Sequence, residues 1–401
     1  MTPGPISAQI TDYANRADPY PLYAELRKQP VRREDDGTYL VSTYDEVRGL
    51  ANDPRLSNDT SNRSPGFARI GQPVESGLPP SFIFTDPPLH DRLRSTINRP
   101  FGPPHSPRFL DGLRGELAKV VTELLDAFAG KGQVDIVEDF AYPLPVTAIC
   151  KVLGVPREDE PRFHVWADAL ASSLDPRSGD DGGADRAQRA RQDIGAYLTD
   201  LIESKRRHPG PGMLSALAPE MTPADLEATA VLLLVAGHET TVNAITNTTL
   251  TLLRHPDVLD RLQREPNLAV PLVEEVLRYE PPVQFVPWTT ALADIDVAGT
   301  TIPKGSPVWL MLAAANRDPR RFEDPDRFDP DRKDNEHLGF YTGIHYCFGA
   351  PLARMELHAA VPELFRRVQF SRLIEDPPPY RANAVLRGPR RLPVAIEGLT
   401  A

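Results

Sequence analysis

The feature that most constrains this chain is a long apolar segment near its middle. Between Ala228 and Leu253 the only formal charge is that of Glu239, and most other residues are apolar or small. A helix that is apolar on all sides is stable only when other elements cover it, so we expect a core helix from Pro223 to Leu253. Its most apolar part, Val231 to Gly237, is far shorter than the roughly 20 residues that span a bilayer, and we expect no membrane partner.

The midpoint of this segment combines residue types that destabilise an apolar helix. Gly237 costs about 1 kcal/mol relative to alanine, and Glu239 places a carboxylate among apolar residues. The hydroxyls of Thr240 and Thr241 can bond to preceding carbonyls and open the helix. One interpretation is a polar kink solvated by an internal water molecule. The other is a groove for a small ligand, in which the carboxylate and a hydroxyl relay protons.

The rest of the sequence favours a mainly α fold with a small antiparallel β region. The chain has 401 residues, of which 40% are hydrophobic and 25% charged, as in globular proteins. We expect a single domain over 1–401, with a hairpin whose strands lie at 296–302 and 308–312. The main helical regions are expected at about 86–280 and 351–367, and the β-rich regions at about 30–45, 283–315 and 380–398.

Charge and cysteine content exclude several classes of protein. The net charge of −11 makes the chain a poor binder of nucleic acid or anionic membranes, because both would repel it. Cys150 and Cys347 are the only cysteines, which excludes a disulfide framework and a cysteine-only zinc or iron–sulfur site. The start of the chain, Met1–Ile10, lacks the basic and apolar regions of a signal peptide, so we expect a cytoplasmic protein.

Cys347 lies in a loop directly ahead of an expected helix. Pro351 suits the first turn of that helix, since its missing N–H is not needed there. The free N–H groups and dipole of a helix N-terminus favour an anionic sulfur. Gly343 and Gly349 would let the backbone pass close to a flat ligand. Cys150, inside an apolar run, is interpreted as a buried structural cysteine, whereas the context of Cys347 favours a functional role.

At this loop the chain resembles the cytochromes P450, the haem–thiolate monooxygenases, and in particular their soluble bacterial members. The haem-binding signature of that family is matched by Phe340, Gly343, His345, Cys347 and Gly349. Three further motifs agree in order and spacing, and the resemblance extends from Tyr20 to the C-terminus. The motifs are Ala236–Thr241, similar to the oxygen-activation segment of the central helix; Glu275–Arg278, similar to the Glu-x-x-Arg pair; and Pro325–Phe328, similar to the segment that completes that pair.

The resemblance implies the cytochrome P450 fold, in which a long central helix lies over haem b (iron protoporphyrin IX). Cys347 would bind the iron as a thiolate, with Gly349 beside it in the cofactor site, and a thiolate ligand favours O–O cleavage. His90 and Arg94 are four residues apart on one helix face and would bind one haem propionate. His345 would contact the other side of the haem.

One position departs from the family's pattern. An Arg-x-Ala triplet is usual shortly before the expected hairpin, and here the triplet reads Thr289-Thr290-Ala291. A neutral Thr289 therefore stands where a propionate-binding arginine is expected, and we assign it no binding role.

The other motifs imply structural and catalytic roles. Glu275 and Arg278 share a helix face and, with Arg327, would form a buried ionic network beneath the haem. Glu239 and Thr240 would be the catalytic residues that deliver the protons consumed in oxygen activation. In that role the hydroxyl holds a water molecule, and the carboxylate reloads it from solvent by rotation.

The expected substrate is a lipophilic small molecule, which the enzyme hydroxylates or epoxidises with O2. By family resemblance it would be a bacterial natural product such as a polyketide or macrolide, a terpene or a peptide. The loop 61–84 and the Gly-rich break at 179–183 suggest a lid over the pocket. The expected pocket residues are Phe84, Leu232, Val235, Ala236, Phe285, Val286 and Leu386.

Electrons must come from another protein, because the chain has no flavin or nucleotide fingerprint. We expect a ferredoxin and a ferredoxin reductase supplied with NAD(P)H. The locally basic segment from Asp86 to Arg114 fits docking of an acidic ferredoxin. The alternative interpretation is a solvated surface on which Arg94 binds the haem. Two other functions stay open: an enzyme of the same family that couples aromatic rings oxidatively, and a non-catalytic haem protein that only binds a ligand.

Overall fold

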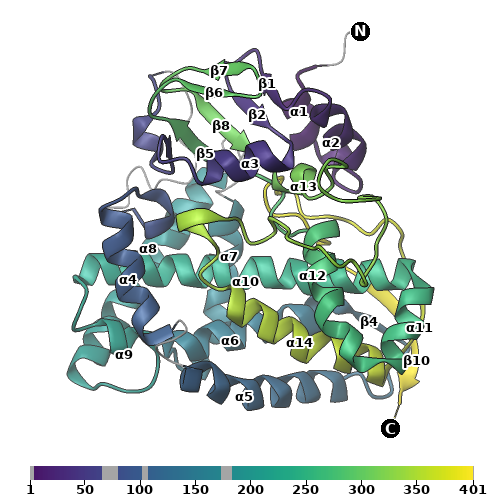
Figure 1. The fold of residues 1–401 in the computed structure, drawn as a ribbon. Coiled ribbons are helices and arrows are strands. Elements are labelled where there is room, and N and C mark those ends of the chain that lie inside the picture. The colour runs from purple at the N-terminus through teal and green to yellow at the C-terminus, as the bar shows by residue number, and fades with distance from the viewer. Residues whose placement is uncertain (1–3, 66–79, 102–106, 173–182, 401) are drawn as a thin grey trace.

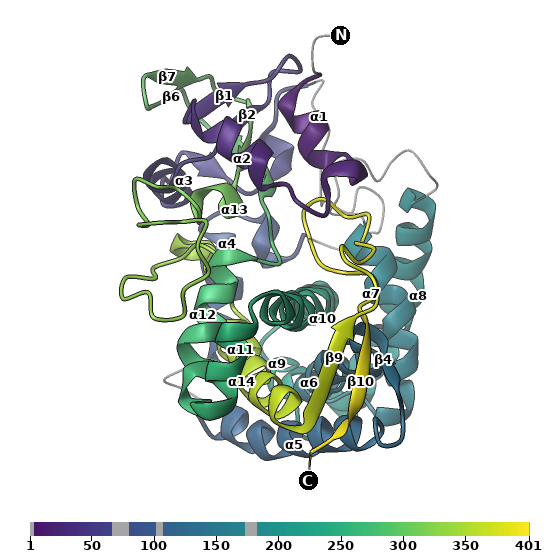
Figure 2. The ribbon, with the colours of Figure 1, turned by 90° about the vertical axis from the view of Figure 1, so that its right-hand side faces the viewer.

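The computed structural model describes residues 4–65, 80–101, 107–172 and 183–400. A helical part and a smaller strand-rich part are visible in both views (Figure 1, Figure 2). The helices are α1 (Ile6–Thr11), α2 (Tyr20–Arg27), α3 (Tyr44–Ala51), α4 (Leu89–Phe101), α5 (Pro107–Asp126), α6 (Pro143–Leu153), α7 (Glu160–Ser172), α8 (Gly183–Arg207), α9 (Met213–Leu217), α10 (Pro223–Arg254), α11 (Pro256–Arg264), α12 (Ala269–Tyr279), α13 (Leu312–Ala315) and α14 (Ala350–Arg367). The strands are β1 (Val31–Arg33), β2 (Tyr39–Val41), β3 (Leu56–Ser57), β4 (Gln133–Asp135), β5 (Val286–Ala291), β6 (Ile295–Val297), β7 (Thr300–Ile302), β8 (Pro307–Leu310), β9 (Val368–Leu373) and β10 (Pro393–Leu399).

The central helix α10 forms as the sequence predicts. The Thr222 side chain caps its first turn by accepting a 3.1 Å hydrogen bond from the backbone N–H of Asp225. The helix ends at Arg254 because His255 precedes a proline, which disfavours helical backbone. It packs against α6, α7, α8, α12 and α14, and Figure 2 shows it end-on among them. By length and composition α10 could cross a membrane, but its most apolar stretch is mostly buried in the protein, so it is a core helix.

The expected small antiparallel β region is present, with one parallel pair within it. The five-stranded sheet has the order β1-β2-β8-β5-β3, and β2 runs parallel to β8. A second sheet has the order β4-β10-β9.

The predicted hairpin is wrong in its second strand. β6 and β7 pair with each other, and the turn between them has Ala298 and Gly299 at φ values of 47° and 75°. Two consecutive positive φ values are typical of a type I′ turn, which joins two strands directly. β8, expected as the second strand, instead lies between β2 and β5 in the five-stranded sheet.

A buried ionic network joins α12 to the irregular coil that leads to Cys347. Glu275 and Arg278 are fully buried, and two hydrogen bonds of 2.8 and 2.7 Å run from the Arg278 guanidinium to the Glu275 carboxylate. The same guanidinium donates to the backbone carbonyls of Asn316, Pro325 and Arg327 at 2.9, 2.8 and 3.1 Å. One cation therefore holds three points of a coil that lacks regular hydrogen bonding.

The role predicted for the Arg327 side chain is wrong. That side chain is 69% exposed and lies 3.9 Å from Asp329, so only the backbone carbonyl of Arg327 joins the network. Arg332 is the second cation, with its Nε 3.4 Å from the Glu275 carboxylate. Backbone carbonyls in an irregular coil have no hydrogen-bond partner in a helix or sheet, so a buried guanidinium satisfies them. The charged side chain of Arg327 stays in solvent instead.

Replacing Arg278 with methionine leaves the buried Glu275 carboxylate largely uncompensated, and we expect the free energy of unfolding to fall by about 3–5 kcal/mol. The matched variant Arg327→Met removes an exposed guanidinium and should change it by less than about 0.5 kcal/mol. Urea-induced unfolding of both variants measures this difference. Equal losses would contradict the assignment of the network to Arg278.

Candidate functional site

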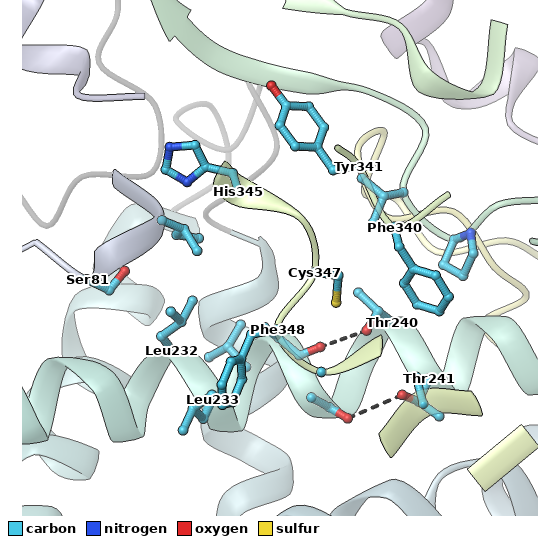
Figure 3. Close-up of a pocket in the computed structure, with 18 of the residues that line it drawn as sticks. Ser81, Leu232, Leu233, Thr240, Thr241, Phe340, Tyr341, His345, Cys347 and Phe348 are labelled. Carbon is cyan, nitrogen blue, oxygen red and sulfur yellow. Dashed lines mark hydrogen bonds between the residues drawn. The ribbon is translucent and has the colours of Figure 1, made fainter. Parts of the chain in front are cut away.

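A cavity of about 340 Å³ lies between α10 and the loop that carries Cys347. In Figure 3 the Cys347 sulfur is turned toward α10, from which Thr240 and Thr241 are drawn. Apolar side chains make up most of the walls, and they come from the turn Phe82–Phe84, α10, β5, α14 and the segment around Leu386.

Local backbone geometry positions the Cys347 loop. The backbone N–H of Cys347 donates to the Phe340 carbonyl at 2.9 Å, and Gly349 is the N-cap of α14. Gly343 has a φ of +70°, and a Cβ there would lie 2.8 Å from the Ala51 carbonyl oxygen, so only glycine fits. The loop therefore rests on the end of α3 and presents its sulfur to the cavity.

The surroundings of Cys347 act on its thiol in two directions. Burial raises the pKa of the Cys347 thiol, while hydrogen bonding from the Gly349 N–H and the charge of Arg94 act to lower it. Burial is the larger effect, so the thiol is stable in its neutral form in the absence of a cation. A metal ion deprotonates a coordinating thiol outright, and the same position then suits a buried metal–thiolate bond.

Two histidines and an arginine gather at one edge of the cavity. The rings of His90 and His345 are 4.5 Å apart, and the Arg94 guanidinium donates to the Tyr346 carbonyl at 2.8 Å. His90 Nε2 and His345 Nδ1 are buried and have no hydrogen-bond partner among the described residues. Burial, His90 and Arg94 lower the pKa of His345 to about 3. Buried nitrogens without partners are costly, so this edge favours a ligand with polar groups.

The position of His345 differs from the sequence expectation. We expected it to contact the opposite side of the haem from His90, but the two rings lie against each other. The reason is that the turn Gly343–His345 passes beside the start of α4, where His90 is located. His90, Arg94 and His345 therefore form one cluster.

Of the two interpretations of the α10 midpoint, the structure favours the groove. Ala236, Gly237, Thr240 and Thr241 line the cavity. The Thr240 hydroxyl donates to the Ala236 carbonyl at 2.7 Å, as expected for a threonine that bonds to the preceding turn. A Cβ on Gly237 would lie 3.0 Å from Ile149 Cδ1, so this glycine also permits close packing of α6.

Glu239 faces away from this groove. It is buried, it does not line the cavity, and its carboxylate lies 2.9 Å from Arg381 Nε. The ion pair compensates the charge that the sequence places in an apolar helix. Glu239 and Thr240 are adjacent in sequence but lie on different faces of α10, so Thr240 alone borders the cavity in this conformation.

A carboxyl group that the sequence did not point to borders the cavity instead. Glu356 on α14 is buried, and burial raises its pKa to about 8, while a hydrogen bond with Thr241 acts to lower it. The sequence signal was available: a single acid on the apolar face of the helix that follows Cys347 is as unusual as Glu239 on α10.

Six of the expected pocket residues line the cavity and one does not. Phe285 is fully buried and stacks on Trp309, with ring centroids 5.0 Å apart and an interplanar angle of 13°. Phe285 lies in the extended segment that leads into β5, where successive side chains point to opposite faces. Its side chain therefore points into the sheet, and that of Val286 points toward the cavity. The residues that line it as expected are Phe84, Leu232, Val235, Ala236, Val286 and Leu386. The suggested lid segments lie largely outside the described residues.

These features fit an iron porphyrin. The thiol is a ligand for iron, the unpartnered imidazole nitrogens and Arg94 match the carboxylates at one edge of the porphyrin, and the apolar walls match its faces. Cavity and thiol together define a haem–thiolate protein. The sequence profile of the cytochrome P450 family matches residues 184–395, and the chain belongs to this family.

Individual relatives agree over nearly the whole chain. The cytochrome P450 monooxygenase PikC of Streptomyces venezuelae is 40% identical over 394 residues, which cover 94% of this chain and 91% of that protein. The 6-deoxyerythronolide B hydroxylase of Saccharopolyspora erythraea is 36% identical over 404 residues, or 95% and 96% of the two chains. The ligand-free crystal structure of Mycobacterium smegmatis CYP164A2 has a TM-score of 0.88 at 37% identity and covers 97% of this chain and 99% of that one. The chain is thus an oxidoreductase of the cytochrome P450 monooxygenase type, and its cofactor is haem.

The raised pKa of Glu356 makes a pH-dependent contribution to stability. The folded protein keeps this proton up to about pH 8, while the unfolded chain releases it near the usual value of 4.5. Stability should therefore fall as pH rises through this window, and Glu356→Gln should remove that fall. Between these pH values, the unfolding free energy of the wild type should fall relative to that of Glu356→Gln by about 1 kcal/mol per pH unit.

The matched control is Glu363→Gln, which changes an exposed acid on the same helix. Chemical denaturation at pH 5, 6, 7 and 8 gives the comparison. A constant difference between wild type and Glu356→Gln at every pH would show that the Glu356 carboxyl titrates normally.

Proposed function

We propose that this protein is a haem b monooxygenase that hydroxylates or epoxidises a lipophilic small molecule, with Cys347 as the thiolate ligand of the iron. When bound, the haem supplies the oxygen-activating chemistry. The observation that carries the proposal is the position of the Cys347 sulfur and Thr240 on the walls of one apolar cavity. We infer that the whole chain acts as one domain, since segments from Asn58 to Leu386 contribute to that cavity, and that it acts in the cytoplasm.

The proposed roles of the protein groups follow from their positions. Cys347 binds the iron, and the Gly349 N–H stabilises the negative sulfur. His90, Arg94 and His345 bind the polar edge of the porphyrin. The Thr240 hydroxyl donates to Ala236, which leaves its oxygen lone pairs to accept a hydrogen bond from a water molecule in the cavity. Glu239 would reload that water by rotating away from Arg381.

The substrate is proposed to be a natural product of the polyketide or macrolide, terpene or peptide classes. The names of the relatives support this: the hydroxylase of Saccharopolyspora erythraea acts on 6-deoxyerythronolide B. The cavity supports a lipophilic substrate, because its walls are mainly apolar. Arg191 of α8 also lines the cavity, and burial lowers its pKa.

We propose a ferredoxin, supplied by an NAD(P)H-dependent reductase, as the electron donor. Leu89, Ile344 and Tyr346 are exposed apolar residues next to the Cys347 loop and the start of α4, and such residues suit a protein contact. Arg92 and Arg99 already form ion pairs with Asp225 and Glu220 at 3.3 and 2.6 Å, which weakens their part in the basic surface.

Reduction by an acidic ferredoxin should slow as ionic strength rises, and a rate independent of salt would count against this partner.

Substitution of serine for Cys347 tests the proposal directly. We expect Cys347→Ser to lose monooxygenase turnover and to shift the absorbance band of the reduced carbon monoxide complex, because an alcohol is a weaker donor than a thiolate. Cys150→Ser changes a buried cysteine of the core and should keep both properties. An unchanged absorbance band of the carbon monoxide complex in Cys347→Ser would contradict the assignment of Cys347 as the iron ligand.

Replacement of Thr240 by alanine tests proton delivery. We expect Thr240→Ala to release more peroxide per NAD(P)H consumed and to reduce product yield by about tenfold or more. Thr248 is the matched control, because it makes the same 2.7 Å bond to the preceding turn but does not line the cavity. Coupling that stays equal in both alanine variants would remove the role of Thr240.

A further inference from the structure

Thr289 does not take over the role of the arginine expected at its position. Its side chain is fully buried, and its hydroxyl donates to the Val308 carbonyl of β8 at 2.6 Å. Thr289 is absent from the cavity wall, whereas its neighbour Trp288 is part of it. The pairing of β5 with β8 shifts register between Val286 and Thr289, and a shift of one residue exchanges the side chains on the two faces of a strand.

The indole of Trp288 has a donor that lacks an acceptor. Its Nε1 is buried, and it has no hydrogen-bond partner among the described residues. An indole N–H can only donate, and leaving it buried without an acceptor destabilises the protein. Because the ring lines the cavity, the molecule that fills the cavity is the natural source of that acceptor.

The turn Phe82–Phe84 places Trp288 at the same edge as the histidine cluster. Phe84 contacts the Trp288 ring with centroids 5.5 Å apart, and Phe82 contacts the His90 ring at 6.5 Å. Trp288 and His90 therefore lie on either side of a three-residue segment. The polar groups of a bound porphyrin that meet His90 and His345 are its carboxylates, so the acceptor nearest to Trp288 is a carboxylate as well.

A buried arginine lies close to the strand at this point. The Arg63 guanidinium donates to the Pro287 carbonyl at 2.7 Å and to the Thr290 hydroxyl at 3.2 Å, and burial lowers its pKa to about 10. These two bonds fall on either side of Trp288 and Thr289. Arg63 does not line the cavity, so it acts as a positioning residue that fixes the strand.

We propose that Trp288 is a haem-binding residue whose Nε1–H donates a hydrogen bond to a haem propionate, in place of the arginine that position 289 lacks. The inference rests on the proposed haem site. It replaces a cationic contact with a neutral one.

The test is the rate at which ferric protein loses haem to excess apomyoglobin. Trp288→Phe keeps the ring contact with Phe84 and removes only the N–H, and we expect about tenfold faster loss, the effect of one hydrogen bond to a charged group. Trp288→Arg, which returns a cation to the cavity wall, should lose haem more slowly than Trp288→Phe. The control Trp309→Phe changes the tryptophan that stacks on Phe285 outside the cavity, and it should match the wild type.

Reconstitution with haem dimethyl ester identifies the acceptor. The ester keeps a carbonyl acceptor but carries no charge, so the difference between the wild type and Trp288→Phe should fall to about threefold or less. Equal haem loss from the wild type and Trp288→Phe with native haem would overturn the proposal, as would a tenfold difference that persists with the ester. If Trp288→Phe weakens only substrate binding, the N–H serves the substrate and the proposal is wrong. Protein that takes up no haem in any variant contradicts the haem site itself, which separates that failure from this one.

Discussion

The burial of α10 governs the arrangement of everything around it. A helix with apolar residues on every side must be covered, and α6, α7, α8, α12 and α14 cover it. The cavity lies where this coverage is incomplete, along the turn that contains Gly237 and Thr240. Glu239, the acid at the midpoint of the helix, is turned the other way and compensated by Arg381. The helix therefore meets the cavity with apolar, small and hydroxyl groups and with no charged side chain.

Opposite that turn, the protein builds the sulfur position from irregular backbone. The coil between α13 and α14 has few regular hydrogen bonds, and Arg278 replaces them by binding three of its carbonyls. The Cys347 loop adds a bond to the Phe340 carbonyl. The ionic pair Glu275–Arg278 is thus remote from the chemistry, yet it determines how firmly the loop is held.

The parts that the sequence predicted well are those governed by local rules. The ends of α10 follow from a threonine cap and a proline, and the Cys347 loop follows from closely spaced glycines, a histidine and a cysteine. The errors concern choices that depend on distant partners. Which strand pairs with β8, and whether Phe285 or Val286 faces the cavity, are decided by the sheet. The buried role of the Arg327 carbonyl could not be predicted, because a sequence pattern reports side chains and not backbone direction.

The contact between Gly343 and the Ala51 carbonyl links the cysteine loop to the first part of the chain. α3 precedes the cavity-lining segments and contributes no side chain to the cavity wall. The last turn of that helix nevertheless limits where the loop that carries the Cys347 sulfur can lie. Chimaeras that exchange N-terminal regions between relatives would therefore have to conserve this end of α3, even when every residue that touches the cavity is left in place.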